Sequence, residues 1–298
     1  MATNVINENA NSQRISSLES EALEINPIPR YYLGVNFLQL IQSEPLSELA
    51  TSALLAYQEV FSEKPWEEEE LMGKPFSIAK PIIIERLKRQ LTNPRSIMVL
   101  LLNPHNPNEV IGFANTQMLS LTDGLVDAEV AMVSYFDQNK LQSIFRHPLI
   151  NAVEKSNRND VFIVEEFGIR KKFRGGPKML IKLTNSLTHA MRILNPAGQT
   201  NEGLMWTSDS SKMNALAQST GMKEVLETSG FRKGKRVRLV CYQFSVSQIE
   251  NLSQGYPQFI LGLLKLSLSE NAKGNPEPLK RFLAQLTGKE IKKINHES

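Results

Sequence analysis

The sequence predicts a mixed α/β protein, and two observations support that prediction. Apolar runs of strand length occur along the whole chain, and between them lie segments whose apolar residues recur every three or four positions. The chain has 298 residues, of which 41% are hydrophobic and 22% charged. This length is enough to bury a sizeable core, and the composition is that of an ordinary globular protein.

The first half of the predicted domain begins with a strand over residues 31–41, where apolar residues alternate. A helix follows from Ser43 to about Val60, with Pro45 in its first turn. A second helix is expected after Pro81 and ends before Pro94. The two apolar runs that come next predict an antiparallel hairpin of residues 97–102 and 110–119. Residues 120–159 indicate a turn, one strand and a short helix, without a functional pattern.

The second half has a sharper pattern. A strand leads through a basic, glycine-containing turn into a helix that begins at Pro177, and a short strand, a short helix and a hairpin follow. Gly221 is placed to end the short helix in a left-handed conformation. In chain order, these elements are the strand 161–169, the turn 170–176, the helix from 177, the strand 204–207, the helix 211–219 and the hairpin 222–228 with 236–244.

The chain divides into three expected parts. Residues 1–26 are rich in Asn, Ser and Glu and predict a mobile tail, residues 27–247 form the domain, and residues 248–298 form a C-terminal helical extension. One helix of this extension has an apolar face made of Leu279, Phe282, Leu283 and Leu286. Such a helix either docks on its own domain or mediates contact with a protein partner or a second copy.

The basic turn is the strongest functional signal. A strand that feeds a helix through glycines exposes backbone N–H groups at the positive end of the helix dipole, where a pyrophosphate fits. The cationic side chains around the turn are Arg170, Lys171, Lys172, Arg174 and Lys178. A solvated basic loop without a ligand is the alternative interpretation.

The element order and two segments resemble the GNAT (GCN5-related N-acetyltransferase) superfamily over roughly residues 33–246. Phe167-Gly-Ile169, followed by Arg170-Lys-Lys-Phe-Arg174-Gly175-Gly176, is similar to the family's fourth strand and pyrophosphate loop. The segment 216–222 is similar to its short helix and the following strand. The resemblance implies a central mixed β-sheet flanked by helices.

The resemblance also implies an activity, a co-substrate and a set of binding residues. An acceptor amine would attack the thioester of acetyl-CoA or another acyl-CoA directly, with backbone N–H groups near the strand end stabilising the thioester oxygen. The residues that the resemblance places at the cofactor are Gly168, Ile169, Arg170, Arg174, Gly175, Gly176 and Lys178.

Three positions depart from the family pattern. Pro177 and Met179 stand where the family has small residues. Ala217 stands where many members have a tyrosine that protonates the leaving thiolate. Proline has no N–H to offer a phosphate. These departures leave two alternatives to an acyl-CoA enzyme: an acyltransferase that uses acyl carrier protein, or a non-catalytic GNAT-like scaffold.

Two adjacent carboxylates, Glu165 and Glu166, are the candidate catalytic bases. Neighbouring residues of a regular strand point to opposite faces, so one of the two is expected to lie under a helix, where burial raises its pKa. Glu166 is favoured because it shares a face with Gly168.

The net charge and the histidine and cysteine content argue against several classes of function. The net charge of +3 argues against nucleic-acid binding, despite the basic segments 170–178 and 232–238. The four histidines show no metal-ligand spacing, so no metal is expected. Cys241 is the single cysteine, and its strand pattern predicts a buried position. The longest apolar run, residues 259–268, is short of the ~20 residues of a membrane span. Because the start also shows no secretory signal, the expected location is cytoplasmic.

Overall fold

The computed structural model describes residues 25–64, 66–120, 160–174, 177–198, 200–209, 211–232 and 235–254. Several sequence-based expectations lie outside these residues. They are the N-terminal tail up to residue 24, the elements within 121–159, the glycines Gly175 and Gly176, and the amphipathic helix at 279–286.

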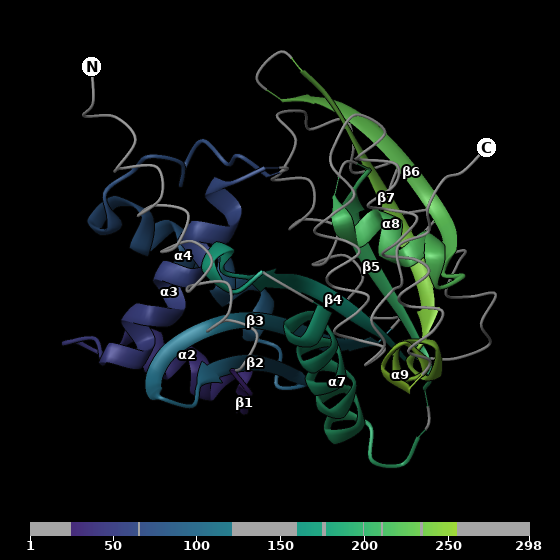
Figure 1. Cartoon of the computed structure of the whole chain (residues 1–298), viewed down its shortest axis with the longest axis horizontal. Helices are drawn as coiled ribbons and strands as arrows, with labels where there is room; N and C mark the ends of the chain where they lie inside the picture. Colours follow the sequence, from purple (N-terminus) through teal and green to yellow (C-terminus); the bar gives the residue numbers. More distant parts are fainter. Residues whose placement is uncertain are drawn as a thin grey trace, which may run out of the picture.

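The described chain is built around one seven-stranded mixed sheet with the order β1-β2-β3-β4-β5-β7-β6 (Figure 1). All neighbours are antiparallel except β4 and β5, which are parallel. The strands are β1 (Ile28–Leu33), β2 (Ser96–Asn103), β3 (Asn106–Ser120), β4 (Asp160–Ile169), β5 (Glu202–Ser208), β6 (Lys223–Arg232) and β7 (Lys235–Ser245). The expected mixed α/β class with a central mixed sheet is therefore confirmed.

Helices cover both faces of the sheet and divide the core into two clusters. On one face, α2 (Gly34–Gln42), α3 (Glu48–Ser62) and α4 (Phe76–Leu91) pack against Met98, Leu100 and Phe113. On the other face, α7 (Pro177–Leu194) and α9 (Val246–Gln254) pack against Ile97, Val99 and Ala114. Alternate residues of the central strands thus supply opposite cores, as the two-residue period of a strand requires. The short elements η1 (Lys171–Phe173) and α8 (Lys212–Ser219) complete the fold.

The expected first strand over residues 31–41 is wrong in most of its length. The strand ends at Leu33, and helix α2 begins at Gly34. Within that helix Phe37, Leu38 and Ile41 are buried, which is the three-and-four spacing of a helix face. A run that is apolar at almost every position fits both periods, so the sequence alone did not separate the two.

Two helix starts also differ from the expectations. Helix α3 begins at Glu48 rather than at Ser43, and the Ser47 hydroxyl oxygen caps it by accepting the Ala50 N–H at 3.2 Å. Helix α4 begins at Phe76 and runs through Pro81. A proline inside a helix removes one hydrogen bond, and the buried residues Ala79 and Ile83 on either side hold the helix against the core.

The second half agrees with the sequence prediction. Helix α7 begins at Pro177, and β6 and β7 form the second hairpin. Gly221, two residues after the end of α8 at Ser219, adopts the left-handed conformation with φ of 71°. None of the helices in the described part of the chain combines the length and hydrophobicity that crossing a bilayer requires.

Candidate active site

The sheet opens between its two parallel strands. β4 and β5 are paired only where Phe162, Ile163 and Val164 face Gly203, Leu204 and Met205. Beyond Val164, β4 continues to Ile169 alongside β3, and β5 continues to Ser208 alongside β7. The two strands therefore diverge (Figure 1). The residues of β4 that follow Val164 include both predicted bases.

An irregularity in β4 determines where those bases point. Asn115 of β3 faces Glu166, but the next residue, Thr116, faces Val164, so Glu165 is the extra residue of a β-bulge. Glu165 accepts a hydrogen bond from the Gln117 side chain, and Asn115 and Gln117 lie on the same face of β3. The expectation that Glu165 and Glu166 point to opposite faces is therefore wrong. The bulge turns both carboxylates toward the α3–α4 side.

Glu166 lies deep in that face, with 7% of its surface exposed. Its Oε1 accepts hydrogen bonds from the Tyr57 hydroxyl at 2.7 Å and from Gln90 Nε2 at 2.8 Å. Burial raises the pKa of the Glu166 carboxyl, and the nearby Arg86 and the two donors act in the opposite direction. Arg86 Nη1 donates to the Tyr57 hydroxyl oxygen at 3.3 Å, so Tyr57 is a shared hydrogen-bond partner of Arg86 and Glu166.

Glu165 is more accessible than Glu166, since Glu165 is partly buried whereas Glu166 is buried. Gln117 Nε2 donates to Glu165 Oε1 at 2.6 Å, and Gln117 in turn accepts from Asn93 Nδ2 at 3.2 Å. Burial of the side chain raises the pKa of Glu165 to about 7, with the Gln117 hydrogen bond opposing the shift. A carboxyl group with that pKa is suited to accept a proton near neutral pH.

The residues that hold the carboxylates were not found from the sequence. Tyr57 is on α3, Gln90 is at the end of α4, and Asn115 and Gln117 are on β3. Each occupies a core-facing position of its element. A polar side chain at a position where the period requires an apolar one is the signal that could have found them, because buried polar groups are hydrogen-bonded.

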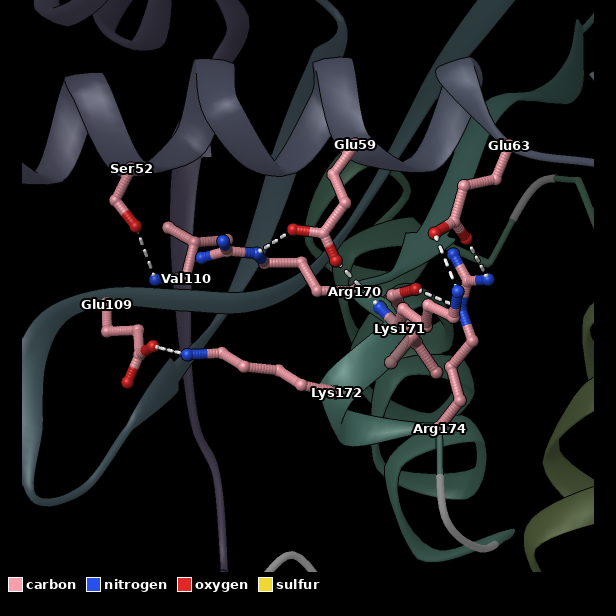
Figure 2. A network of polar contacts seen from close by, with 10 residues as sticks. Ser52, Glu59, Glu63, Glu109, Val110, Arg170, Lys171, Lys172 and Arg174 are labelled. Carbon is pink, nitrogen blue, oxygen red and sulfur yellow. Dashed lines mark hydrogen bonds and ion pairs between the residues drawn. The ribbon is translucent and has the colours of Figure 1, made fainter. Parts of the chain in front are cut away.

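The basic turn is held by carboxylates of α3 and β3 (Figure 2). Arg170 pairs with Glu59 at 2.8 Å, and Arg174 pairs with Glu63 at 2.7 Å. Lys172 forms an ion pair with Glu109. Lys178, at the start of α7, is exposed. The positive side chains expected around a diphosphate are thus mostly engaged with acidic side chains of the same chain.

The backbone of the turn also differs from the expectation of unpaired amides. The Arg170 N–H donates to the Ile111 carbonyl at 2.9 Å, and the Lys171 N–H donates to Glu59 Oε1 at 2.9 Å. The N–H groups of Phe173 and Arg174 donate within the 3₁₀ turn. At these four positions the amides already have acceptors. Gly175 and Gly176, the remaining amides of interest, lie outside the described residues.

Gly168 serves the packing of β4 against α3. A Cβ atom at this position would lie 2.8 Å from a methyl group of Val60 and 2.9 Å from Phe113 Cζ. Its hydrogen therefore allows helix α3 to approach the strand closely. Ile169, the other expected strand-end residue, packs against the α7 core. Ala217 is fully buried and offers no acidic group.

No protein-family model matches the chain, and no curated protein sequence matches it. The solved structures that it resembles include arylalkylamine N-acetyltransferase 2 from Aedes aegypti, at 10% identity and a TM-score of 0.46, covering 73% of this chain and 99% of that one. A polyamine N-acetyltransferase of Drosophila melanogaster matches at 11% identity and a TM-score of 0.41, covering 74% of this chain and 100% of that one. Arabidopsis thaliana NAA60 in complex with acetyl-CoA matches at 10% identity and a TM-score of 0.33, covering 50% of this chain and 76% of that one.

The class of protein follows from the order of the elements along the chain. The described chain begins with a strand, helices and a hairpin, and continues with a strand that ends in a basic turn. A helix, a strand, a short helix and a second hairpin come after that turn. This is the order that the sequence resemblance to the GNAT superfamily implies. The described part of the chain thus has the GNAT-like fold that the sequence leads us to expect.

Proposed function

We propose that the protein is an N-acyltransferase that transfers an acyl group, in the simplest case acetyl, from acyl-CoA to an amine. The observation that carries this proposal is the partly exposed Glu165. It sits on the β4 bulge, one residue beyond the last parallel pair between β4 and β5. A base with a pKa of about 7 at this place is suited to take the proton that an attacking amine must lose.

The reaction follows from direct attack. The amine nitrogen forms a bond to the thioester carbonyl carbon, Glu165 accepts its proton, and the C–S bond breaks to release a thiolate that takes up a proton. Backbone N–H groups near Gly168 and Ile169 would stabilise the charge on the thioester oxygen. Glu166 is more deeply buried than Glu165, so it would influence the base Glu165 rather than contact the substrate.

The donor would be bound at the turn after β4. Arg170, Arg174 and Lys178 carry the charge for the diphosphate, and Gly168, Ile169, Gly175 and Gly176 supply backbone. Arginine binds phosphate with strong, charge-assisted hydrogen bonds. Since Arg170 and Arg174 are paired with Glu59 and Glu63, a diphosphate would have to replace these carboxylates as the acceptor.

The test is thiol release from acetyl-CoA by the full-length protein in the presence of a panel of aromatic and aliphatic amines. We expect Glu165→Gln to lower kcat by about 10²- to 10⁴-fold, the usual contribution of a general base. Glu85→Gln is the matched control, because Glu85 is a carboxylate on the exposed side of α4. Equal rates for wild type and Glu165→Gln would refute the proposed role of Glu165.

A second candidate, a non-catalytic scaffold, is favoured by the internal pairing of the basic turn. Thermal stability should be measured with acetyl-CoA, a long-chain acyl-CoA and an acylated carrier protein. Stabilisation by the carrier protein alone would favour an acyltransferase that takes its donor from that carrier. No stabilisation by any of the three donors would favour the scaffold, whose partner contact would then be sought at the helix that the sequence predicts at residues 279–286.

A further inference from the structure

The two carboxylates at the bulge have different polar surroundings, although both point to the same side. Each is held by a chain of two amides: Asn93 and Gln117 lead to Glu165, and Asn115 and Gln90 lead to Glu166. Asn115 Nδ2 donates to Gln90 Oε1 at 2.8 Å, and Gln90 Nε2 donates to Glu166 at 2.8 Å. The chain toward Glu166 is entirely buried, whereas Glu165 keeps part of its surface exposed.

The cation that acts on Glu166, the partly exposed Arg86, is paired with other carboxylates. Arg86 Nη1 lies 2.5 Å from Glu68 Oε2, and Arg86 Nη2 lies 3.2 Å from Glu70 Oε2. The Glu68 side chain is 3% exposed and the Arg86 side chain 26%, so Glu68 is the buried member of this pair. In the described part of the chain the donors to Glu166 are Tyr57 and Gln90, and both are neutral. An ionised Glu166 would therefore be a buried anion without a direct ion pair, which is costly.

Opposite Glu166 in the sheet lies a buried hydrogen-bond acceptor, the side-chain oxygen of Asn115. Asn115 Oδ1 has no hydrogen-bond partner among the described residues, and Asn115 is 0% exposed. Asn115 faces Glu166 directly in the β3–β4 ladder, and both side chains are on the α4 side of the sheet. Directly opposed residues bring their side chains within contact distance. An ionised Glu166 facing this oxygen would offer it no hydrogen, whereas a carboxylic acid at the same position has an O–H to donate.

We propose that Glu166 is a neutral carboxylic acid in the folded protein and donates its O–H to Asn115 Oδ1, which leaves Glu165 as the single negative charge of the pair. Glu166 is thus a positioning residue that keeps its neighbour free of like-charge repulsion. The protonation of Glu166 stands independently of any reaction, whereas its effect on the base rests on the proposed acyl transfer.

Among the described residues, the charged and titratable groups that act on Glu166 are Arg86, Tyr57 and Glu165. Arg86 on α4 favours ionisation, but it binds Glu68 and Glu70. Tyr57 on α3 stays protonated, because burial and the nearby carboxylates raise its pKa well above the ordinary value. Glu165 on the same strand raises the pKa of Glu166 further, and burial contributes most.

Infrared difference spectroscopy on the protein without donor tests the proton directly. The spectrum of wild type minus Glu166→Gln, at about pH 8 where Glu165 is mostly ionised, should contain the C=O band of one hydrogen-bonded carboxylic acid. Wild type minus Glu165→Gln and wild type minus Glu85→Gln should each contain carboxylate bands. A carboxylate band in place of the acid band for Glu166 would overturn the proposal.

Asn115→Ala provides a second variant, since it removes the proposed acceptor while keeping the acid. The acid band should persist and move to the higher frequency of a carboxylic acid whose O–H lacks that acceptor. An unchanged band position would refute Asn115 as the partner.

If acyl transfer is observed, the pH profile provides a third readout, because it reports whether Glu166 carries a charge beside the base. With a neutral Glu166, the acid limb of the Glu166→Gln profile should stay at the wild-type pH. An ionised Glu166 would raise the pKa of Glu165, so its removal would shift the limb to lower pH and refute the proposal. Absence of acyl transfer would refute the proposed function and leave the infrared result intact.

Discussion

Replacing Glu165 by glutamine should stabilise the protein at neutral pH. The pKa of Glu165 is about 7 in the folded protein, against about 4.3 for a glutamate in an unfolded chain. The difference of about 2.7 pKa units, at 1.36 kcal/mol each, sets an upper limit of about 3.7 kcal/mol on the cost of this carboxyl group above pH 7. Glu165 is partly exposed, and solvent reduces the effect, so we expect about 2 kcal/mol.

The direction of the pH dependence follows from the raised pKa. Below about pH 4 the carboxyl is protonated in both states, and glutamine and glutamate should give similar stability. Between about pH 4 and pH 7 the unfolded chain loses its proton first, so the wild type becomes less stable relative to Glu165→Gln. Above about pH 7 the difference should be constant.

Urea unfolding of wild type, Glu165→Gln and the control Glu85→Gln, each at about pH 4 and about pH 8, measures this difference. A stability gain for Glu165→Gln that is equal at both pH values would contradict the reasoning, because it would not come from ionisation. A loss of stability at about pH 8 would show that the folded protein favours the ionised form.

Three further outcomes are expected. Gly168→Ala should destabilise the fold by about 1–3 kcal/mol, because its methyl group would overlap Val60, and adding Val60→Ala should recover part of that loss in urea unfolding; additive losses in the double variant would exclude the contact as the cause. Ser47→Ala should lower the free energy of unfolding by about 1 kcal/mol through loss of the cap on the Ala50 N–H, whereas Ser47→Asp should restore it. Cys241 is 0% exposed and burial raises the pKa of its thiol, so a thiol reagent should label it only after unfolding, and rapid labelling of the native protein would contradict this.

Elements with one clear period were predictable from the sequence. The hairpin of β2 and β3, the strand β4 and the helix that starts at Pro177 all appear where the patterns placed them. Prediction failed where two periods fit the same residues, as in the run that became α2. It also failed where a proline suggested a boundary, because Pro81 lies inside α4 and not before it.

The candidate site was predictable in its location and not in its geometry. The adjacent glutamates and the basic turn were visible in the sequence, but the β-bulge at Glu165 depends on how β4 pairs with β3. The partners of these residues come from distant segments: Tyr57 is 109 positions from Glu166, and Glu63 is 111 positions from Arg174. A local pattern contains no information on such pairs.

The parallel junction between β4 and β5 has a mechanical consequence. Within the residues that the structure describes, the sheet half β1–β4 and the sheet half β5–β7–β6 are paired through three residue pairs of β4 and β5. In the sheet, helix α7 packs mainly against β2 and β3, and its buried residues share one core with Val99 of the first half and Val240 of the second. A change in the angle between the halves would disturb few backbone hydrogen bonds, so the shared side-chain core has to resist such a change. Leu183 and Met191 of α7 belong to that core, and substitutions there would act on the relative position of the two halves without touching the candidate bases.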